Sequence, residues 1–178
     1  MSPEEKQRRD EYRKTLTHEQ RATMAIGVLM LNWAYWDGDI THHIFFLRDK
    51  AATEIDVSAQ RVLSLHKDRL KTLRRLVVAL TADKSEEVRR YDAIAGIVAP
   101  LTVLRGAIAH GLVGVGNPSG THEDLRLILF SQRHDDSVGE LSRTGSMEMP
   151  RVSEVFEAAD TIWDERQKLQ QLVSGLTG

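Results

Sequence analysis

Apolar side chains recur at spacings of three and four residues over most of the segment 18–49. This spacing matches the period of an α-helix that buries one face, so the segment is predicted to form one long amphipathic helix that tolerates Gly38 in its interior. Such a helix packs its apolar face against other elements of a core, which favours a helical bundle. The apolar face comprises Ile26, Leu29, Trp33, Trp36, Ile40, Ile44 and Leu47.

The N-terminal segment is predicted to be a separate, charged helix. Ser2 and Glu5 have the spacing of a capping box, and Pro3 suits the first turn of a helix. The predicted helix 2–15 carries charges on most faces and so has little apolar surface to bury. We therefore expect residues 1–16 to form an exposed N-terminal helical arm.

Three later stretches show the same helical period: residues 58–81, 83–110 and 150–173. Pro100 lies inside the second stretch and cannot donate a hydrogen bond to the carbonyl of Gly96, so a kink is expected there. The starts of the three helices are indicated by Asp56 or Ser58, by Asp83 and by Pro150.

Between the last two helical stretches the pattern changes to two short apolar runs, 112–115 and 125–130. The turn-forming residues 116–120 lie between them, which is typical of a β-hairpin. The polar residues 133–146 are predicted to be a loop. The sequence thus predicts a single domain over residues 1–178 with a mainly α fold. We expect an up-and-down bundle of about five helices with a small β-hairpin inserted before the last helix.

The composition excludes several classes of site. The chain has 178 residues, no cysteine and a formal net charge of −2. Without cysteine, the chain cannot form disulfides, zinc ribbons, iron–sulfur clusters or a cysteine nucleophile. The net charge gives no general attraction to nucleic acids or anionic membranes, so such binding would depend on local charge. No metal site and no cofactor are predicted.

No segment is predicted to act at a membrane. The most apolar run, residues 24–36, has 13 residues, whereas a helix needs about 20 to cross a bilayer. Residues 2–21 carry charges of both signs and lack the apolar core of a signal peptide. We therefore expect a cytoplasmic protein with no membrane partner.

The segment 104–111 combines two residue types that can act on a phosphate group. Arg105 offers a planar cation that fits phosphate, and His110 can transfer a proton near neutral pH. Because five positions on a helix span about 7.5 Å, the two side chains would line one edge of a groove. They suit metal-independent cleavage of a phosphodiester by a 2′-hydroxyl. The alternative is structural, because an arginine and a histidine near a helix C-terminus also offset the helix dipole.

This stretch resembles the Arg-x4-6-His signature of HEPN domains (higher eukaryotes and prokaryotes nucleotide-binding). The stretch from Trp33 to Asp37 resembles an aromatic-rich helix of that family, which in many bacterial members ends in an acidic residue. The resemblance implies a helical bundle that dimerises, so that two Arg–His pairs meet in one groove. It implies Arg105, His110 and Asp37 as the catalytic residues. Many members are metal-independent ribonucleases of toxin–antitoxin or antiphage systems, so the implied partners are a second copy, an RNA substrate and an antitoxin protein.

The residue after the arginine departs from the family pattern. Active members often have a polar residue there, such as asparagine, whereas this chain has Gly106. Glycine has no side chain that could orient the site. Other members of the family have lost catalysis and serve as interaction modules. The alternative function is therefore a non-catalytic helical dimer that binds or regulates a protein partner.

Positive charge is concentrated between Arg61 and Arg75, with six basic residues and one acid. Four of the basic residues form a stripe away from the leucine face of the predicted helix 58–81, and such a stripe can hold an RNA backbone. The alternative is an ordinary solvated surface, because no aromatic residue interleaves with the stripe to stack on bases. The predicted RNA-binding residues are Lys67, Lys71, Arg74 and Arg75.

Three residues on apolar faces are predicted to be packed rather than catalytic. His66 lies on the leucine stripe of the predicted helix 58–81, where a histidine is more often part of a core or an interface than a ligand. Trp33 and Trp36 lie on the inner face of the predicted helix 18–49, which favours a core or a dimer interface over a cofactor site.

Overall fold

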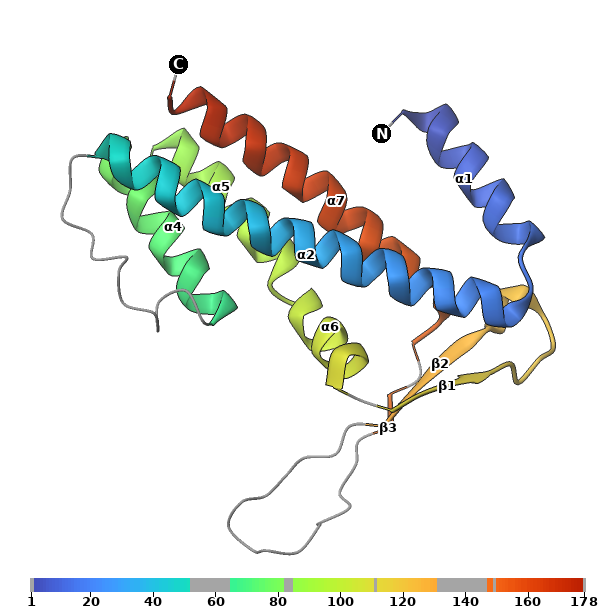
Figure 1. The fold of residues 1–178 in the computed structure, drawn as a ribbon. Coiled ribbons are helices and arrows are strands. Elements are labelled where there is room, and N and C mark those ends of the chain that lie inside the picture. The colour runs from blue at the N-terminus through green and yellow to red at the C-terminus, as the bar shows by residue number, and fades with distance from the viewer. Residues whose placement is uncertain are drawn as a thin grey trace, which may run out of the picture. The chain divides into compact units, whose positions relative to one another are not determined.

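The computed structural model describes residues 2–51, 65–81, 85–110, 112–130, 147–148 and 150–177. Over these residues the chain is mostly helical (81%), with a small antiparallel hairpin before the last helix (Figure 1). The predicted mainly α fold is therefore confirmed.

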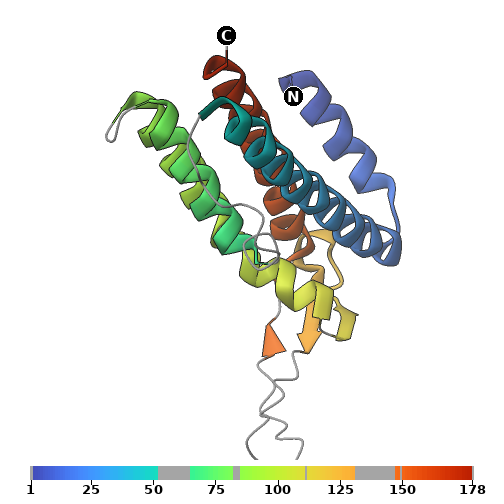
Figure 2. The ribbon, with the colours of Figure 1, turned by 60° about the vertical axis from the view of Figure 1, so that its left-hand side comes forward.

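The described part of the chain contains six α-helices, one short 3₁₀ helix and three strands (Figures 1 and 2). The helices are α1 (Pro3–Thr15), α2 (His18–Ala51), α4 (His66–Leu80), α5 (Glu86–Val98), α6 (Leu101–His110), η1 (His122–Asp124) and α7 (Val152–Gly175). The strands are β1 (Leu112–Gly116), β2 (Arg126–Phe130) and β3 (Met147–Glu148).

The contacts of the chain divide it into two compact units. Unit 1 comprises Met1–Leu31 and Leu101–Asp160, and unit 2 comprises Asn32–Pro100 and Thr161–Gly178. Unit 1 therefore contains α1, α6 and the strands, whereas unit 2 contains α4 and α5. Helices α2 and α7 each contribute residues to both units.

Helix α2 confirms the long amphipathic helix predicted over 18–49 and continues to Ala51. Its predicted apolar face is the buried face, with the exception of Ile26, which is half-buried. The buried positions, each at most 3% exposed, are Leu29, Trp33, Trp36, Ile40, Ile44 and Leu47.

The helix predicted over 83–110 is interrupted. Helix α5 ends at Val98 and α6 begins at Leu101, so the kink expected at Pro100 is a break between two helices. The break follows from the missing N–H of proline, because the α-helical ladder loses one hydrogen bond at that point.

The helix starts differ in detail from those predicted. Ser85 caps α5, and its Oγ accepts a hydrogen bond from the N–H of Val88 at 3.2 Å. Helix α4 begins at His66 in the described residues. The predicted caps Asp56, Ser58 and Asp83, and the predicted loop 133–146, lie outside the described residues.

The β-hairpin lies in unit 1 and pairs β1 with β2 in antiparallel register, with Gly114 opposite Ile128. Glycine in β1 allows Ile128 to pack close to the backbone, because a Cβ added at Gly116 would lie 3.2 Å from Ile128 Cδ1. Strand β3 pairs with the other edge of β2. The sequence does not predict β3, since a strand of two residues has no detectable period.

Strand β2 is also joined to the start of α7 in unit 1. The N–H of Leu127 donates to the carbonyl of Pro150 at 2.9 Å, and the N–H of Val152 donates to the carbonyl of Leu125 at 2.8 Å. These bonds hold Pro150 beside the sheet, so α7 begins at Val152 and not at Pro150 as predicted. Because Leu125 and Leu127 are at most 1% exposed, this junction belongs to the core of unit 1.

Helix α1 is attached to α7 through arginines. The side chain of Arg13 is only 6% exposed, and its Nη2 lies 3.4 Å from Asp160 Oδ1. Its guanidinium carbon also lies 3.8 Å from the centroid of the Phe156 ring. Arg9 Nη2 bonds to Asp160 Oδ2 at 2.5 Å. Helix α1, which belongs to the predicted N-terminal arm, therefore contacts α7 through a buried charge pair and a cation–π contact.

Unit 2 contains the apolar cores of α4 and α5. Tyr91 donates its hydroxyl hydrogen to the carbonyl of Leu70 at 2.7 Å, which links the two helices. Burial raises the pKa of the Tyr91 phenol above its ordinary range, so the hydroxyl remains a donor. Arg74 and Asp92 add an exposed bidentate pair at 2.7 and 2.9 Å. The buried apolar side chains of this part include Leu73, Leu76, Val77, Val88, Ile94 and Val98.

We predict that Asp160→Asn destabilises the fold by about 2 kcal/mol, because it leaves the guanidinium of Arg13 buried without its full counter-charge. Urea unfolding measures the difference. The matched control is Asp92→Asn, which breaks the exposed pair with Arg74 and should cost less than about 1 kcal/mol. Equal losses in the two variants would contradict the prediction that the buried pair contributes more to stability than the exposed pair.

Candidate functional site

Arg105 and His110 lie in unit 1 on the last two turns of α6. His110 is the final residue of the helix and is exposed, whereas Arg105 is half-buried. Their separation of five positions corresponds to about 7.5 Å along the helix axis. The structure thus places both residues on the predicted helix, at its C-terminal end, where the helix dipole favours a cation.

The guanidinium of Arg105 has unused hydrogen-bonding capacity. Its Nε is buried and has no hydrogen-bond partner among the described residues. No described Asp or Glu forms an ion pair with it either, whereas Arg69, Arg74 and Arg166 are each paired with an aspartate. A guanidinium without a carboxylate partner can accept an anionic group such as phosphate.

Gly106 lies between these two residues on the same helix. A Cβ added at Gly106 would meet no atom within 4 Å, so a larger side chain fits there without displacing a neighbour. The glycine is therefore not required by packing in unit 1. It leaves open space beside Arg105, because no atom of the described residues lies within 4 Å of the added Cβ.

Asp37, the third predicted catalytic residue, belongs to unit 2 and is bonded there. Its Oδ1 lies 2.7 Å from Nδ1 of His66, and its Oδ2 lies 2.9 Å from Nη2 of Arg69. Both carboxylate oxygens thus contact α4. Arg105 and His110 belong to unit 1. The three predicted catalytic residues are therefore divided between the two units.

Sequence reasoning assigned neither Arg69 nor His66 of this cluster to a site. The ring centroid of His66 lies 4.9 Å from that of Trp33, and the His66 side chain is 16% exposed. Since Asp37 binds Nδ1, Nε2 is the nitrogen left for a further bond, and it is buried with no partner in the described part of the chain. The leucine stripe of α4 predicts that His66 is packed. It contains no signal for the bond between His66 and Asp37, a carboxylate 29 residues away.

The predicted RNA-binding stripe lies on α4, and its four residues are not equivalent. Lys67, Lys71 and Arg75 are exposed. Arg74 forms the exposed bidentate pair with Asp92 described above, so its charge is already paired. The exposed cationic surface of α4 is therefore smaller than the sequence predicts.

A second carboxylate of α2 organises the contact with α7 in unit 2. Asp39 Oδ2 accepts hydrogen bonds from Arg166 Nε and from Gln170 Nε2, both at 2.7 Å. The guanidinium carbon of Arg166 also lies 5.0 Å from the ring centroids of Tyr35 and Trp163. This arginine therefore joins α2 to α7 through one ion pair and two aromatic contacts.

His43 is a buried histidine of α2 whose two ring nitrogens have no partner among the described residues. It is 8% exposed. Burial lowers the pKa of its imidazole below the ordinary value, and the nearby charge of Arg166 adds to this, whereas Asp39 acts in the opposite direction. The folded state therefore holds the ring neutral at pH 7.

We predict that His43 makes the fold less stable in acid. The unfolded chain binds a proton at a pKa of about 6.5, whereas the folded chain resists protonation. Stability should therefore fall as the pH drops below about 6.5, by up to about 1.4 kcal/mol per pH unit from this residue. Urea unfolding of the wild type and of His43→Leu across this range gives the difference. A difference that is independent of pH would contradict the assignment.

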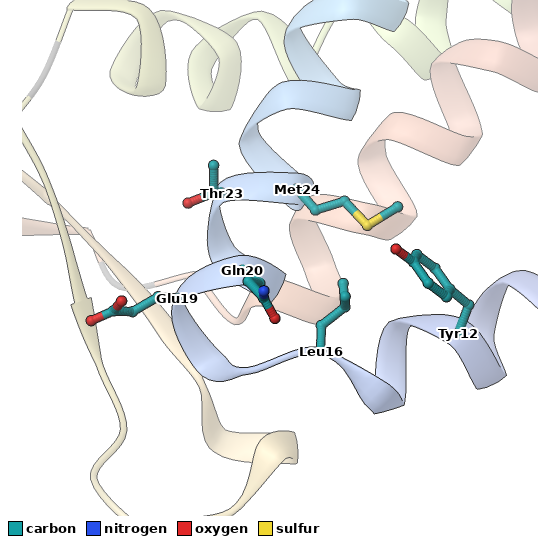
Figure 3. Close-up of a pocket in the computed structure, with 6 residues that line it drawn as sticks. All are labelled: Tyr12, Leu16, Glu19, Gln20, Thr23 and Met24. Atoms are coloured by element: carbon teal, nitrogen blue, oxygen red, sulfur yellow. The ribbon is translucent and has the colours of Figure 1, made fainter.

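An open pocket lies between α1 and the first turns of α2 in unit 1, with a volume of about 540 Å³. Figure 3 shows the Tyr12 ring and the Met24 side chain on facing sides of it. Neither Arg105 nor His110 lines this pocket. The lining residues are Tyr12, Leu16, Glu19, Gln20, Thr23 and Met24.

Two further features bear on the expected partners. Within the described ranges, no group of three or more histidine or acidic side chains is arranged to hold a metal ion. The stretch Glu86–His110 is long and apolar enough to cross a bilayer by length and composition. Only 17% of its apolar window is buried. One such helix is weak evidence for a membrane, so this stretch does not identify a membrane partner, and the cytoplasmic location remains a prediction.

Comparisons of the chain with protein-family models, with curated proteins and with solved structures found no match.

Proposed function

We propose that the chain is a HEPN-like RNA-binding protein that cleaves RNA without a metal ion, as a dimer, within a toxin–antitoxin or antiphage system. One observation carries the proposal. Helix α6 ends with an exposed His110, and five positions earlier it holds Arg105, which has no carboxylate partner among the described residues. A cation available for phosphate and a proton-transfer group on the same helix end are what such a reaction needs.

The reaction is a transfer of a phosphodiester to the neighbouring 2′-oxygen. The 2′-oxygen attacks phosphorus and loses its proton to a base, while the 5′-oxygen leaves and takes up a proton. His110, when it carries a proton on both ring nitrogens, supplies one to the leaving oxygen. Arg105 stabilises the charge that develops on the phosphate oxygens. The base is the histidine of the second copy across the shared groove.

Two other groups of residues have separate roles in the proposal. Lys67, Lys71 and Arg75 are exposed on α4 and bind the RNA backbone through its phosphates. Asp37 has both carboxylate oxygens bonded within unit 2, which supports a role in holding α4. The catalytic roles are therefore assigned to Arg105 and His110.

A non-catalytic interaction module is the second candidate function. It is favoured by Gly106, which gives no polar side chain to orient Arg105, and by the apolar surface of the same helix. Val103 of α6 is 65% exposed, although it lies two positions before Arg105. An exposed valine on this helix fits a protein partner better than it fits RNA.

We predict that the purified chain cleaves single-stranded RNA in the presence of a metal chelator and leaves 2′,3′-cyclic phosphate and 5′-hydroxyl ends. Arg105→Ala and His110→Ala should each lower the cleavage rate by about 100-fold or more, because each removes a group that acts in the transition state. The measurement is the rate of cleavage of a labelled RNA, with end analysis of the products.

The control for this experiment is Arg8→Ala on α1, which removes an exposed arginine outside the site. Its cleavage rate should equal that of the wild type. Cleavage that survives both Arg105→Ala and His110→Ala would refute the site. Absence of any cleavage by the wild type, with dimerisation intact, would favour the interaction module.

We predict that Gly106→Asn raises the cleavage rate several-fold, because the open space at this position admits an amide that can hydrogen bond near Arg105. Gly106→Ala is the matched control. It should stabilise α6 by about 0.5–1 kcal/mol through helix propensity and leave the cleavage rate unchanged. Equal effects of the two variants on cleavage would show that the backbone of α6, not a missing side chain, limits the reaction.

A further inference from the structure

Unit 2 contains a pocket that none of the residues of the proposed function lines. It lies where the end of α4, the start of α5 and the last turns of α7 meet, and its volume is about 310 Å³. Sites for small molecules have volumes of about 300–1,000 Å³, so this pocket suits a ligand at the small end of that range. Its lining includes Leu80, Glu87, Arg90, Leu172 and Leu176.

Two opposite charges line the pocket without a partner in the described part of the chain. The Glu87 and Arg90 side chains form no ion pair or hydrogen bond with any described residue. They lie three positions apart on α5, a spacing at which such side chains are neighbours and can pair. Glu86 and Arg89 have the same spacing one position earlier, and they do pair, at 2.7 Å. The two charges that face the pocket are therefore available to a ligand.

The other polar side chains of the pocket do not neutralise these charges. Thr81 donates its hydroxyl hydrogen to the carbonyl of Val77 at 2.8 Å, which keeps it within the end of α4. Gln171 of α7 is uncharged. The electrostatic character of the pocket is therefore set by one carboxylate and one guanidinium.

These two groups define the chemical class of the ligand. Arg90 suits a carboxylate, because a guanidinium can donate hydrogen bonds to both of its oxygens. Glu87 suits an ammonium group and repels additional negative charge, which disfavours phosphates and dicarboxylic acids. The last turn of α7 also lines the pocket, and a helix C-terminus attracts a cation. The ligand therefore carries one ammonium and one carboxylate.

The spacing of the two side chains limits the size of the ligand. Residues three positions apart on a helix have their Cβ atoms about 5–6 Å from each other. An ammonium and a carboxylate on the same carbon atom can therefore reach Glu87 and Arg90 together. This arrangement is that of an α-amino acid.

Three leucines of the pocket indicate the side chain of that amino acid. Leu172 is buried, whereas Leu80 and Leu176 are half-buried and retain surface that faces solvent. An aliphatic side chain placed on them removes apolar surface from water on both molecules. We propose that the pocket binds a free α-amino acid with an aliphatic side chain, its carboxylate on Arg90 and its ammonium on Glu87.

Titration of the full chain with L-leucine tests the proposal, followed by amide NMR spectra. Saturable shifts are expected at the start of α5 and in the last turns of α7. Three analogues each lack one recognised feature: L-leucinamide lacks the carboxylate, N-acetyl-L-leucine lacks the ammonium, and glycine lacks the side chain. Each should bind about tenfold more weakly or worse, because each leaves one part of the pocket without its partner.

Substitutions on α5 test the two charges separately. Arg90→Gln and Glu87→Gln should each raise the dissociation constant for L-leucine about tenfold or more. The matched controls are Arg89→Gln and Glu86→Gln, which make the same changes of charge on the same helix but outside the pocket lining. Both controls should bind L-leucine as the wild type does. Circular dichroism verifies that each variant keeps its helices.

Three results would overturn the proposal: no saturable shifts in the wild type, equal binding of L-leucine and L-leucinamide, or an Arg90→Gln variant that binds as tightly as Arg89→Gln. The pocket and the proposed function can fail independently. Arg105→Ala and His110→Ala test the chemistry on RNA and should leave the dissociation constant for L-leucine unchanged.

Discussion

Two aspartates of α2 hold the helices of unit 2 in place. Asp37 and Asp39 are two positions apart, so they leave the helix on opposite flanks of its buried stripe. Asp37 binds His66 and Arg69 of α4, and Asp39 binds Arg166 of α7. Half-buried charge pairs of this kind contribute modestly to stability but specify which neighbour occupies each flank. The face of α2 opposite its buried stripe is then left to solvent.

Ion pairs with aspartates occupy some of the positive charges of α4 and leave others exposed. The sequence suggests one basic stripe, yet Arg69 is turned to Asp37 and Arg74 to Asp92. Arg74 forms two parallel bonds with Asp92 through its planar fork, whereas Arg69 contacts Asp37 through Nη2. Lys67 and Lys71 remain exposed. A count of basic residues along α4 therefore overstates the number of unpaired positive charges that could bind RNA phosphates.

The elements that depend on local pattern could be predicted from the sequence, and the contacts between distant residues could not. The apolar period of α2, the capping box at Ser2 and the break at Pro100 are all encoded within a few residues. The sequence also predicts that Arg105 and His110 lie on one helix, because they are separated by only about one and a half turns. No local pattern encodes that Arg13 pairs with Asp160, 147 residues away. The same holds for the bond between Asp37 and His66.

The depth of a charge pair also decides how it responds to ionic strength. Mobile ions screen charges at a protein surface over about 8 Å at physiological salt, but they reach buried charges far less. The pair between Arg13 and Asp160 is 6% and 12% exposed at its side chains, whereas that between Arg74 and Asp92 is 44% and 46% exposed. Concentrated salt would therefore loosen the link between α4 and α5 while α1 stays attached to α7.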